Sequence, residues 1–367
     1  MLYLSIDQHR KQLTVSLRNE AGRIVLRRQV STEPARVRTF FHELRDQARE
    51  EGGFVAIVEV CGFNDWLIRM LGEYGCREVV LVHPDKRSKK KTDRRDANAL
   101  GELLWVNRHR LVGGERLQRL RRVCLVSDED QESRQVTALR QRLGRTRTRT
   151  INQIKRILNR HNLMWDCPTR TFQTEKVRHW LKELELPGID RIELDQLLEQ
   201  WQIWEKQLGA VEREITARTQ QDENVRLLRS VPGMGEYSGL ALASRIGPVE
   251  RFPAPRSLAN YFGLTPGCRN SGEVTDRLGS ITKEGSQMAR FILGQLVLHV
   301  LKKDPRMREW YKRIKRRRGS KIARVAVMRR LATIFWHMLT HREPYLSGGP
   351  RRRLRKPAAA PAACAAG

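Results

Sequence analysis

The chain has 367 residues, enough for two or three domains, and its 71 Lys and Arg outnumber 41 Asp and Glu to give a formal charge of +30. A surplus of this size attracts a polyanion, because each neutralised phosphate releases condensed counterions. The composition therefore favours nucleic acid over an anionic membrane surface, and no segment is long and apolar enough to span a bilayer. There is no pattern of a secretory signal, and the six cysteines form no Cys-x-x-Cys pair, which favours free thiols in a reducing cytoplasm over a zinc ribbon.

The first 108 residues have the pattern of an α/β domain. Apolar and polar residues alternate over residues 2–30, which predicts strands with a turn at 19–22. The elements expected next are a helix from Pro34, a buried strand over 54–60 ending at Glu59, a helix around 66–71, a strand over 79–82 and a helix over 93–104. Strands that alternate with helices favour an α/β sheet domain over residues 1–108.

The middle of the chain, residues 109–223, is expected to be helical. Two long helical patterns run over about 132–163 and 194–215, and no acidic residue occurs between Ser133 and Trp165. These patterns indicate either an antiparallel coiled-coil arm, which would oligomerise or span a partner, or a plain layer of a helical bundle.

Residues 224–345 predict a mainly helical third domain. Its expected features are a hairpin at 231–237, a Gly-rich loop region at 263–285, and apolar helices around 287–302 and 322–340. The tail over 346–367 is mostly Gly, Pro, Arg and Ala, which is typical of disorder.

Four carboxylates are candidates for a metal site. Asp7 and Glu59 each end a predicted strand, and Asp93 and Asp96 are three residues apart on one helix face. Converging oxygen donors suit hard cations, and two Mg²⁺ ions can clamp the attacking and leaving oxygens of a phosphodiester exchange, with Mn²⁺ as an alternative. Each carboxylate taken alone is more often a cap or a surface charge. Together they favour a metal site, because the basic run of residues 86–91 precedes Asp93 and can contact phosphates.

Two glycine-containing segments are candidates for contact with DNA. Gly233 and Gly235 stand before a helix, as in a helix–hairpin–helix that binds a phosphate backbone, although a simple turn fits as well. Ser271 lies in a Gly-flanked loop where a serine could be a nucleophile, although most such Ser-Gly pairs are turns, and no Gly-x-Ser-x-Gly elbow is present.

Taken in order, these segments resemble the DEDD transposases of insertion sequences, which include pilin-gene inverting recombinases and bridge-RNA-guided recombinases. The resemblance is carried by Ile6-Asp7, by Val58-Glu59 with Gly62, by residues 91–97 and 231–235, by residues 263–266 with Ser271-Gly272, and by residues 279–285 with Arg290. One departure is Cys61, which stands where the family usually has Thr or Ser.

The resemblance implies an RuvC-like, RNase H-type N-terminal domain with the acid quartet Asp7, Glu59, Asp93 and Asp96. It also implies a C-terminal transposase domain in which Ser271 attacks a DNA phosphate, forming a phosphoserine link that a DNA hydroxyl later resolves. The partners implied are DNA at the element ends and target, a structured noncoding guide RNA, and further copies of the chain in a homodimer or homotetramer. Such a protein would work in a prokaryotic cytoplasm, associated with the nucleoid.

Residues expected to contact nucleic acid lie in the basic stretches and glycine segments. They are Lys89, Lys90, Lys91, Arg94, Arg145, Arg147, Arg149, Lys155, Arg156, Gly233, Gly235, Lys283, Arg316, Arg317 and Arg318.

Two other interpretations stay open at the level of the sequence. In one, the protein is a metal-dependent nuclease or junction resolvase that uses water as the nucleophile, and Ser271 is inert. In the other, it binds RNA or DNA without catalysis, although an intact carboxylate quartet argues against a decayed site.

Overall fold

A computed structural model describes residues 1–83, 93–113, 115, 117–118, 122–268 and 278–349, without the side chains of 93–96, 268 and 278. The chain forms two compact units that divide between Leu125 and Val126. Residues 109–125 thus belong with the N-terminal unit. The expected disordered tail from 350 onward lies outside the described residues.

The first unit is built on a mixed six-stranded sheet in the order β3-β2-β1-β4-β5-β6. Its strands are β1 (Leu2–Gln8), β2 (Gln12–Arg18), β3 (Ile24–Ser31), β4 (Phe54–Glu59), β5 (Cys76–Val82) and β6 (Arg122–Val123). The expected turn joins β2 to β3, where the Gly22 N–H donates to the Asn19 carbonyl. β1 pairs antiparallel with β2 and parallel with β4, and β4 pairs parallel with β5.

Alternate residues of the central strands face two different helical layers. Leu4, Ile6 and Val58 join the core formed with α1 (Pro34–Glu50) and α2 (Asp65–Glu73). Tyr3 and Ile57 point the other way, into the core formed with α3 (Asp93–Val106). The short helix α4 (Arg108–Val112) follows α3. Both faces of the sheet are therefore covered, which explains why β1 is buried along its whole length.

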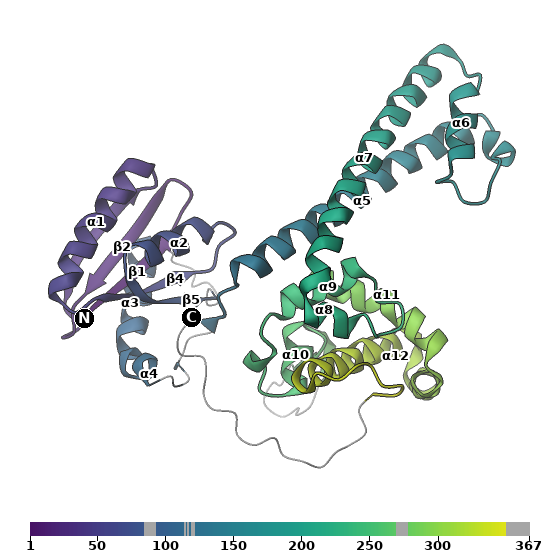
Figure 1. The fold of residues 1–367 in the computed structure, drawn as a ribbon. Coiled ribbons are helices and arrows are strands. Elements are labelled where there is room, and N and C mark those ends of the chain that lie inside the picture. Colours follow the sequence, from purple (N-terminus) through teal and green to yellow (C-terminus); the bar gives the residue numbers. More distant parts are fainter. Residues whose placement is uncertain (84–92, 114, 116, 119–121, 269–277, 350–367) are drawn as a thin grey trace. The chain divides into compact units, whose positions relative to one another are not determined.

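The second unit begins with two long helices, α5 (Asp128–Arg160) and α7 (Gly188–Gln221), which run side by side (Figure 1). Their ion pairs join Glu132 to Arg218, Arg140 to Glu212, Arg147 to Glu205 and Arg160 to Asp190. In these pairs the residue number rises along α5 while that of its partner on α7 falls, so the two helices are antiparallel. At the far end of the pair, η1 (Leu163–Asp166) and α6 (Glu175–Glu183) enclose a small apolar core around Trp201.

The remaining helices form a separate apolar core. They are α8 (Glu223–Leu228), α9 (Glu236–Ile246), η2 (Val249–Arg251), α10 (Pro255–Tyr261), α11 (Gln287–Lys303) and α12 (Pro305–His341). α12 contains a break at Gly319, whose φ of 83° and ψ of 166° are not helical. The apolar helix expected near 322–340 is therefore only the second half of a longer element.

The composition of residues 263–285 predicts a Gly-rich loop, but the region also contains two short strands. β7 (Pro266–Cys268) and β8 (Leu278–Ile281) pair antiparallel, with Pro266 opposite Ile281. Gly and Pro in these strands hide the signal, because both residues are depleted in strands generally.

A buried carboxylate fastens the segment after α12 to the start of that helix. Asp304 caps the helix by accepting from the Met307 N–H, and it also accepts from the Tyr345 hydroxyl at 2.6 Å and the Gly348 N–H at 2.7 Å. Burial raises the pKa of Asp304, but these donors outweigh it and hold the pKa below its ordinary value.

Candidate active site

Asp7 and Glu59 lie side by side at one edge of the sheet. β1 and β4 are parallel, with Ile6 opposite Val58, so the next residue on each strand is a carboxylate. Because side chains alternate, Asp7 and Glu59 both face the side of the sheet that α3 covers, as Ile57 does. Asp7 is only 7% exposed and Glu59 is half-buried, so both are partly shielded from water.

The start of α3 is held close to these strands. The Ser5 hydroxyl, two residues before Asp7, donates to the Ala97 carbonyl at 2.7 Å. Asp93 and Asp96 are helical, although their side chains lie outside the described residues. They stand four residues before buried Ala97 and Leu100, so helical periodicity puts their positions on the sheet-facing side of α3.

A buried hydrogen-bond network behind the carboxylates ties the ends of β1 and β4 together. The Asn64 amide nitrogen donates to Gln8 Oε1 at 2.8 Å and to the Glu59 carbonyl at 3.1 Å. The Asn64 side-chain oxygen accepts from the Cys61 N–H at 2.6 Å. Gln8 in turn donates from Nε2 to the Phe63 carbonyl. Sequence reasoning misses this network, because an asparagine just before a helix is usually a cap. Here it makes no side-chain cap bond to α2.

The surroundings of Asp7 are polar and carry negative charge. His9 Nε2 lies 3.2 Å from Asp7 Oδ2, and Thr14 stands opposite Asp7 in the β1–β2 register. Thr14 is buried, and its hydroxyl has no hydrogen-bond partner among the described residues. Burial raises the pKa of the Cys61 thiol, and the charges of Asp7 and Glu59 raise it further. Asp7 and Glu59 thus both lie close enough to Cys61 for their charges to act on its thiol.

The donor chemistry at this edge fits a hard divalent cation. Carboxylate oxygens with a hydroxyl nearby are ligands that Mg²⁺ and Mn²⁺ accept. Within the described part of the chain, however, no three His, Cys, Asp or Glu side chains are grouped closely enough to hold an ion. The quartet with Asp93 and Asp96 therefore stays a prediction.

Ser271 and several basic candidates lie outside the described residues. Ser271 falls in the connection between β7 and β8, and Lys89, Lys90 and Lys91 fall in the connection before α3. Arg94 is placed on α3 by its backbone only.

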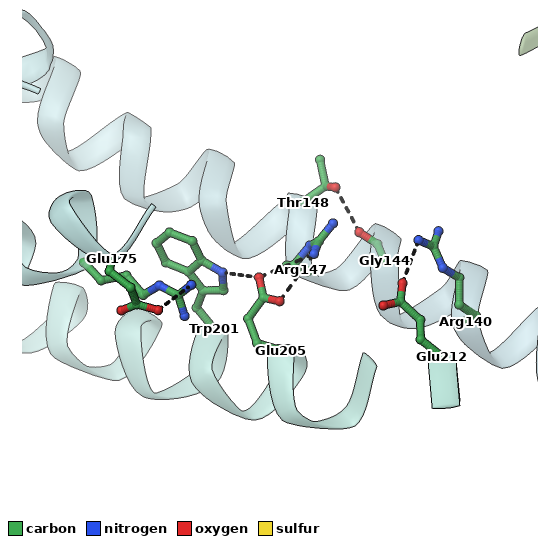
Figure 2. Close-up of polar contacts among 9 residues, drawn as sticks. Arg140, Gly144, Arg147, Thr148, Glu175, Trp201, Glu205 and Glu212 are labelled. Atoms are coloured by element: carbon green, nitrogen blue, oxygen red, sulfur yellow. Dashed lines mark hydrogen bonds and ion pairs between the residues drawn. The ribbon is translucent and has the colours of Figure 1, made fainter. Parts of the chain in front are cut away.

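The arginines of α5 divide into inward and outward sets. Figure 2 shows Arg147 reaching Glu205 and Arg140 reaching Glu212 across the helix pair, with Trp201 Nε1 also donating to Glu205. The arginines on the outer face of α5 reach solvent: Arg142, Arg145, Arg149 and Arg156. Lys155 lies over the Phe172 ring at 4.9 Å. Arg147, at 25% exposure and paired, is therefore a weaker candidate for a phosphate contact than Arg145 or Arg149.

The two glycines of the hairpin differ in their surroundings. Gly233 has a φ of 85°, and a Cβ there would lie 2.4 Å from the His299 Cβ, so this glycine permits close packing on α11. At Gly235, which precedes α9, a Cβ would meet open space. The other basic candidates, Lys283, Arg316, Arg317 and Arg318, are exposed.

Paired carboxylates at the edge of a mixed sheet, in a chain of charge +30, are features of enzymes that cut and join nucleic acid. A family model described as "Transposase" of the DEDD IS110 type matches residues 4–163, and one described as "Transposase IS116/IS110/IS902 family" matches residues 225–312. Together they cover more than half of the chain. The chain belongs to this family of transposases and is an enzyme that cuts and joins DNA.

Curated relatives agree with this membership. A transposase for an insertion sequence element of Coxiella burnetii is 28% identical over 80% of this chain and 79% of its own length. A probable family 20 transposase of Pseudomonas aeruginosa is 27% identical, over 89% of this chain and 93% of its own. A pilin gene-inverting protein of Moraxella bovis is 24% identical over 48% of this chain and 49% of its own. The resemblance found in the sequence is thereby confirmed. Among the described residues, no helix is long and apolar enough to cross a membrane.

Proposed function

We propose that this transposase cuts and rejoins DNA through a covalent link to Ser271, with Mg²⁺ held by Asp7, Glu59, Asp93 and Asp96. The observation that carries the metal site is the β1–β4 register, which sets Asp7 beside Glu59 on the side of the sheet covered by α3. An RuvC-like fold of the first unit belongs to the same proposal. The sheet order β3-β2-β1-β4-β5 and its parallel β1-β4-β5 core support it.

The proposed chemistry is two successive phosphoryl transfers. The Ser271 oxygen attacks a DNA phosphorus, the phosphorus–oxygen bond to one strand breaks, and the departing oxygen takes up the proton equivalent that the serine gives up. A DNA hydroxyl then attacks the phosphoserine and restores the Ser271 hydroxyl. One phosphoester bond is made for each one broken, so strand joining needs no external energy source.

The residues at the sheet edge have separate tasks in this scheme. Asp7 and Glu59 would supply ligand oxygens, while Asn64 and Gln8 hold the two strand ends at a fixed spacing. When bound, the metal supplies positive charge that stabilises the reacting phosphate and favours an ionised nucleophile.

The proposal extends to the partners. The chain would act as a homodimer or homotetramer associated with the nucleoid in the prokaryotic cytoplasm. A structured noncoding RNA would select element ends and target by base pairing, while the basic protein holds backbone and shape. The outward arginines on one face of α5 support binding to such a polyanion.

A covalent-trapping assay tests the proposed chemistry. Protein with its co-purifying RNA is mixed with labelled element-end and target DNA and Mg²⁺, denatured, and resolved on a gel. We expect an adduct with the wild type and with Ser280→Ala, an exposed control on β8, and none with Ser271→Ala. Asp7→Asn should also abolish it while leaving the melting temperature similar. Cleavage without an adduct, unchanged in Ser271→Ala, would favour the hydrolytic nuclease.

A further inference from the structure

The first half of α12 carries an unusual density of exposed cations. Residues 312–318 include Lys312, Arg313, Lys315, Arg316, Arg317 and Arg318. Each of them is exposed, and no ion pair involving them is seen among the described residues. Like charges three and four residues apart destabilise a helix, so this segment is a stretch that a polyanion would stabilise.

These cations point in all directions around the helix. At about 100° per residue, Lys312, Arg316 and Arg313 cover one side, and Arg317, Arg318 and Lys315 continue around the other. The outward arginines of α5 differ, because Arg142, Arg145 and Arg149 follow a 3–4 spacing that keeps them on one face. A one-sided stripe can lie along a single phosphate backbone. A helix that is basic all round is suited to a site with phosphates on two sides.

The cationic segment lies just before a sharp bend between the two halves of α12. A straight helix would separate residues 310 and 330 by roughly 30 Å. Instead, the Arg330 guanidinium lies 4.7 Å from the centre of the Trp310 ring. The chain turns at Gly319, whose backbone angles are available essentially to glycine alone. Met307 is fully buried and Tyr311 packs on the core, so the start of α12 is anchored. We call residues 312–321 the basic tip.

One side of the basic tip is hollowed. A cavity of about 420 Å³ is lined by Trp310, Arg313, Ile314, Arg317 and Arg318. Three of its five lining side chains are guanidinium groups, which suit phosphates.

We propose that the basic tip inserts into the major groove of duplex DNA. This inference rests on the proposed function, since it assumes that the bound polyanion includes DNA of the element or target. An α-helix, about 10–12 Å across, fits the major groove of B-form DNA, about 12 Å wide, and there phosphates line both walls. The deep, narrow major groove of A-form RNA does not admit a helix in this way. The tip is therefore a contact to DNA duplex.

The test measures binding of the full-length protein by fluorescence anisotropy, in a Ser271→Ala background so that no strand is cut. The probes are a DNA duplex, an RNA duplex of the same sequence and the single DNA strand, at several salt concentrations. The tip variant replaces Arg313, Arg316 and Arg318 with Gln. The control variant removes equal charge from α5, replacing Arg142, Arg145 and Arg149 with Gln. Circular dichroism checks that both variants retain the wild-type helix content.

We expect the tip variant to lose affinity for the DNA duplex more than for the other two probes. Its slope of log K against log salt on the duplex should fall by about 0.9 for each phosphate that the variant no longer neutralises, or roughly 2–3 in total. Methylation of guanine N7, which blocks the major groove, should weaken binding of the control variant but not of the tip variant. Equal decreases in affinity for all three probes, or indifference of every protein to N7 methylation, would overturn groove insertion. Neither result depends on adduct formation, so failure here is distinct from failure of the serine chemistry.

Discussion

Replacing Asn64 with Ala tests whether the network behind Asp7 and Glu59 positions the two strand ends. The Asn64 side chain is 4% exposed and makes three hydrogen bonds, to Gln8, to the Glu59 carbonyl and from the Cys61 N–H. Alanine removes all three and leaves buried groups of Gln8 and Cys61 without these partners. Two other contacts join β1 to this segment: the Cys61 thiol donates to Gln8 Oε1 at 3.7 Å, and Gln8 Nε2 donates to the Phe63 carbonyl at 3.0 Å.

The expected cost follows from the number of bonds and their burial. A buried hydrogen bond contributes about 1 kcal/mol net, and an unsatisfied buried group costs about 1–3 kcal/mol. Cys61 is only half-buried, so water can hydrogen-bond to its N–H in the variant and reduce the cost. We therefore expect a loss of about 2–4 kcal/mol in the free energy of unfolding of the first unit. At about 4 °C per kcal/mol, its melting midpoint would fall by roughly 8–16 °C.

Thermal unfolding and a Mg²⁺ titration of adduct formation measure the two consequences. Asn19→Ala is the matched control, because the Asn19 side chain accepts one exposed hydrogen bond, from the Arg23 N–H, and should cost under about 1 kcal/mol. A positioning role also predicts that Asn64→Ala needs more Mg²⁺ for half-maximal activity at a temperature where the variant is folded. The positioning role is refuted if Asn64→Ala melts no lower than Asn19→Ala, or if it melts lower with an unchanged Mg²⁺ requirement.

Three further outcomes are expected from packing, charge and pairing. Gly233→Ala should lower the free energy of unfolding by about 2–4 kcal/mol in denaturant titration, because a methyl group meets His299 at a positive φ; an unchanged midpoint would contradict this. The lowered pKa of Asp304 means that its carboxylate stabilises the fold above its unfolded pKa of about 3.9, and that this contribution is lost as the pH falls through the folded pKa. Asp304→Asn should therefore be less stable at pH 7 and lose less stability on acidification, whereas parallel pH–melting curves would argue against it. Arg149→Gln should lower the salt slope of DNA or RNA binding by about 0.7–0.9, while Arg147→Gln should leave the slope unchanged and weaken the helix pair; equal slopes for the two variants would refute the division of α5 into inward and outward faces.

Local patterns are sufficient to predict most of the regular elements. Alternation in residues 2–30 indicates the strands β1–β3, and Pro34 with the apolar stripe after it indicates the start of α1. The two long middle helices are also expected, although each extends beyond the apolar residues that reveal it. Such signals are reliable because they depend on neighbours within a few residues.

Other elements escape sequence reasoning because their local signal is weak or misleading. The β7–β8 pair is hidden by Gly and Pro, and its strands hold each other through pairing across the connection. The first half of α12 shows in the sequence only as a basic stretch, because its cations mask the apolar anchors Met307 and Tyr311. Arg147 is grouped with its outward neighbours, since sequence alone does not show that α7 places Glu205 opposite it.

The sequence by itself determined which residues could do chemistry: the carboxylates at strand ends, the serine in its Gly-flanked loop, the surplus of Lys and Arg, and the ordered motifs that indicate the family. Only the tertiary structure decided which of them meet. Asp7 and Glu59 are separated by 52 positions in the chain and become neighbours because β1 pairs with β4. Asn64 does not cap α2 with its side chain and instead donates a hydrogen bond to Gln8 at the end of β1. The reason is physical: alternation and periodicity are set by adjacent residues. The choice of partner depends on how distant apolar faces bury one another, and no short stretch of the chain records that.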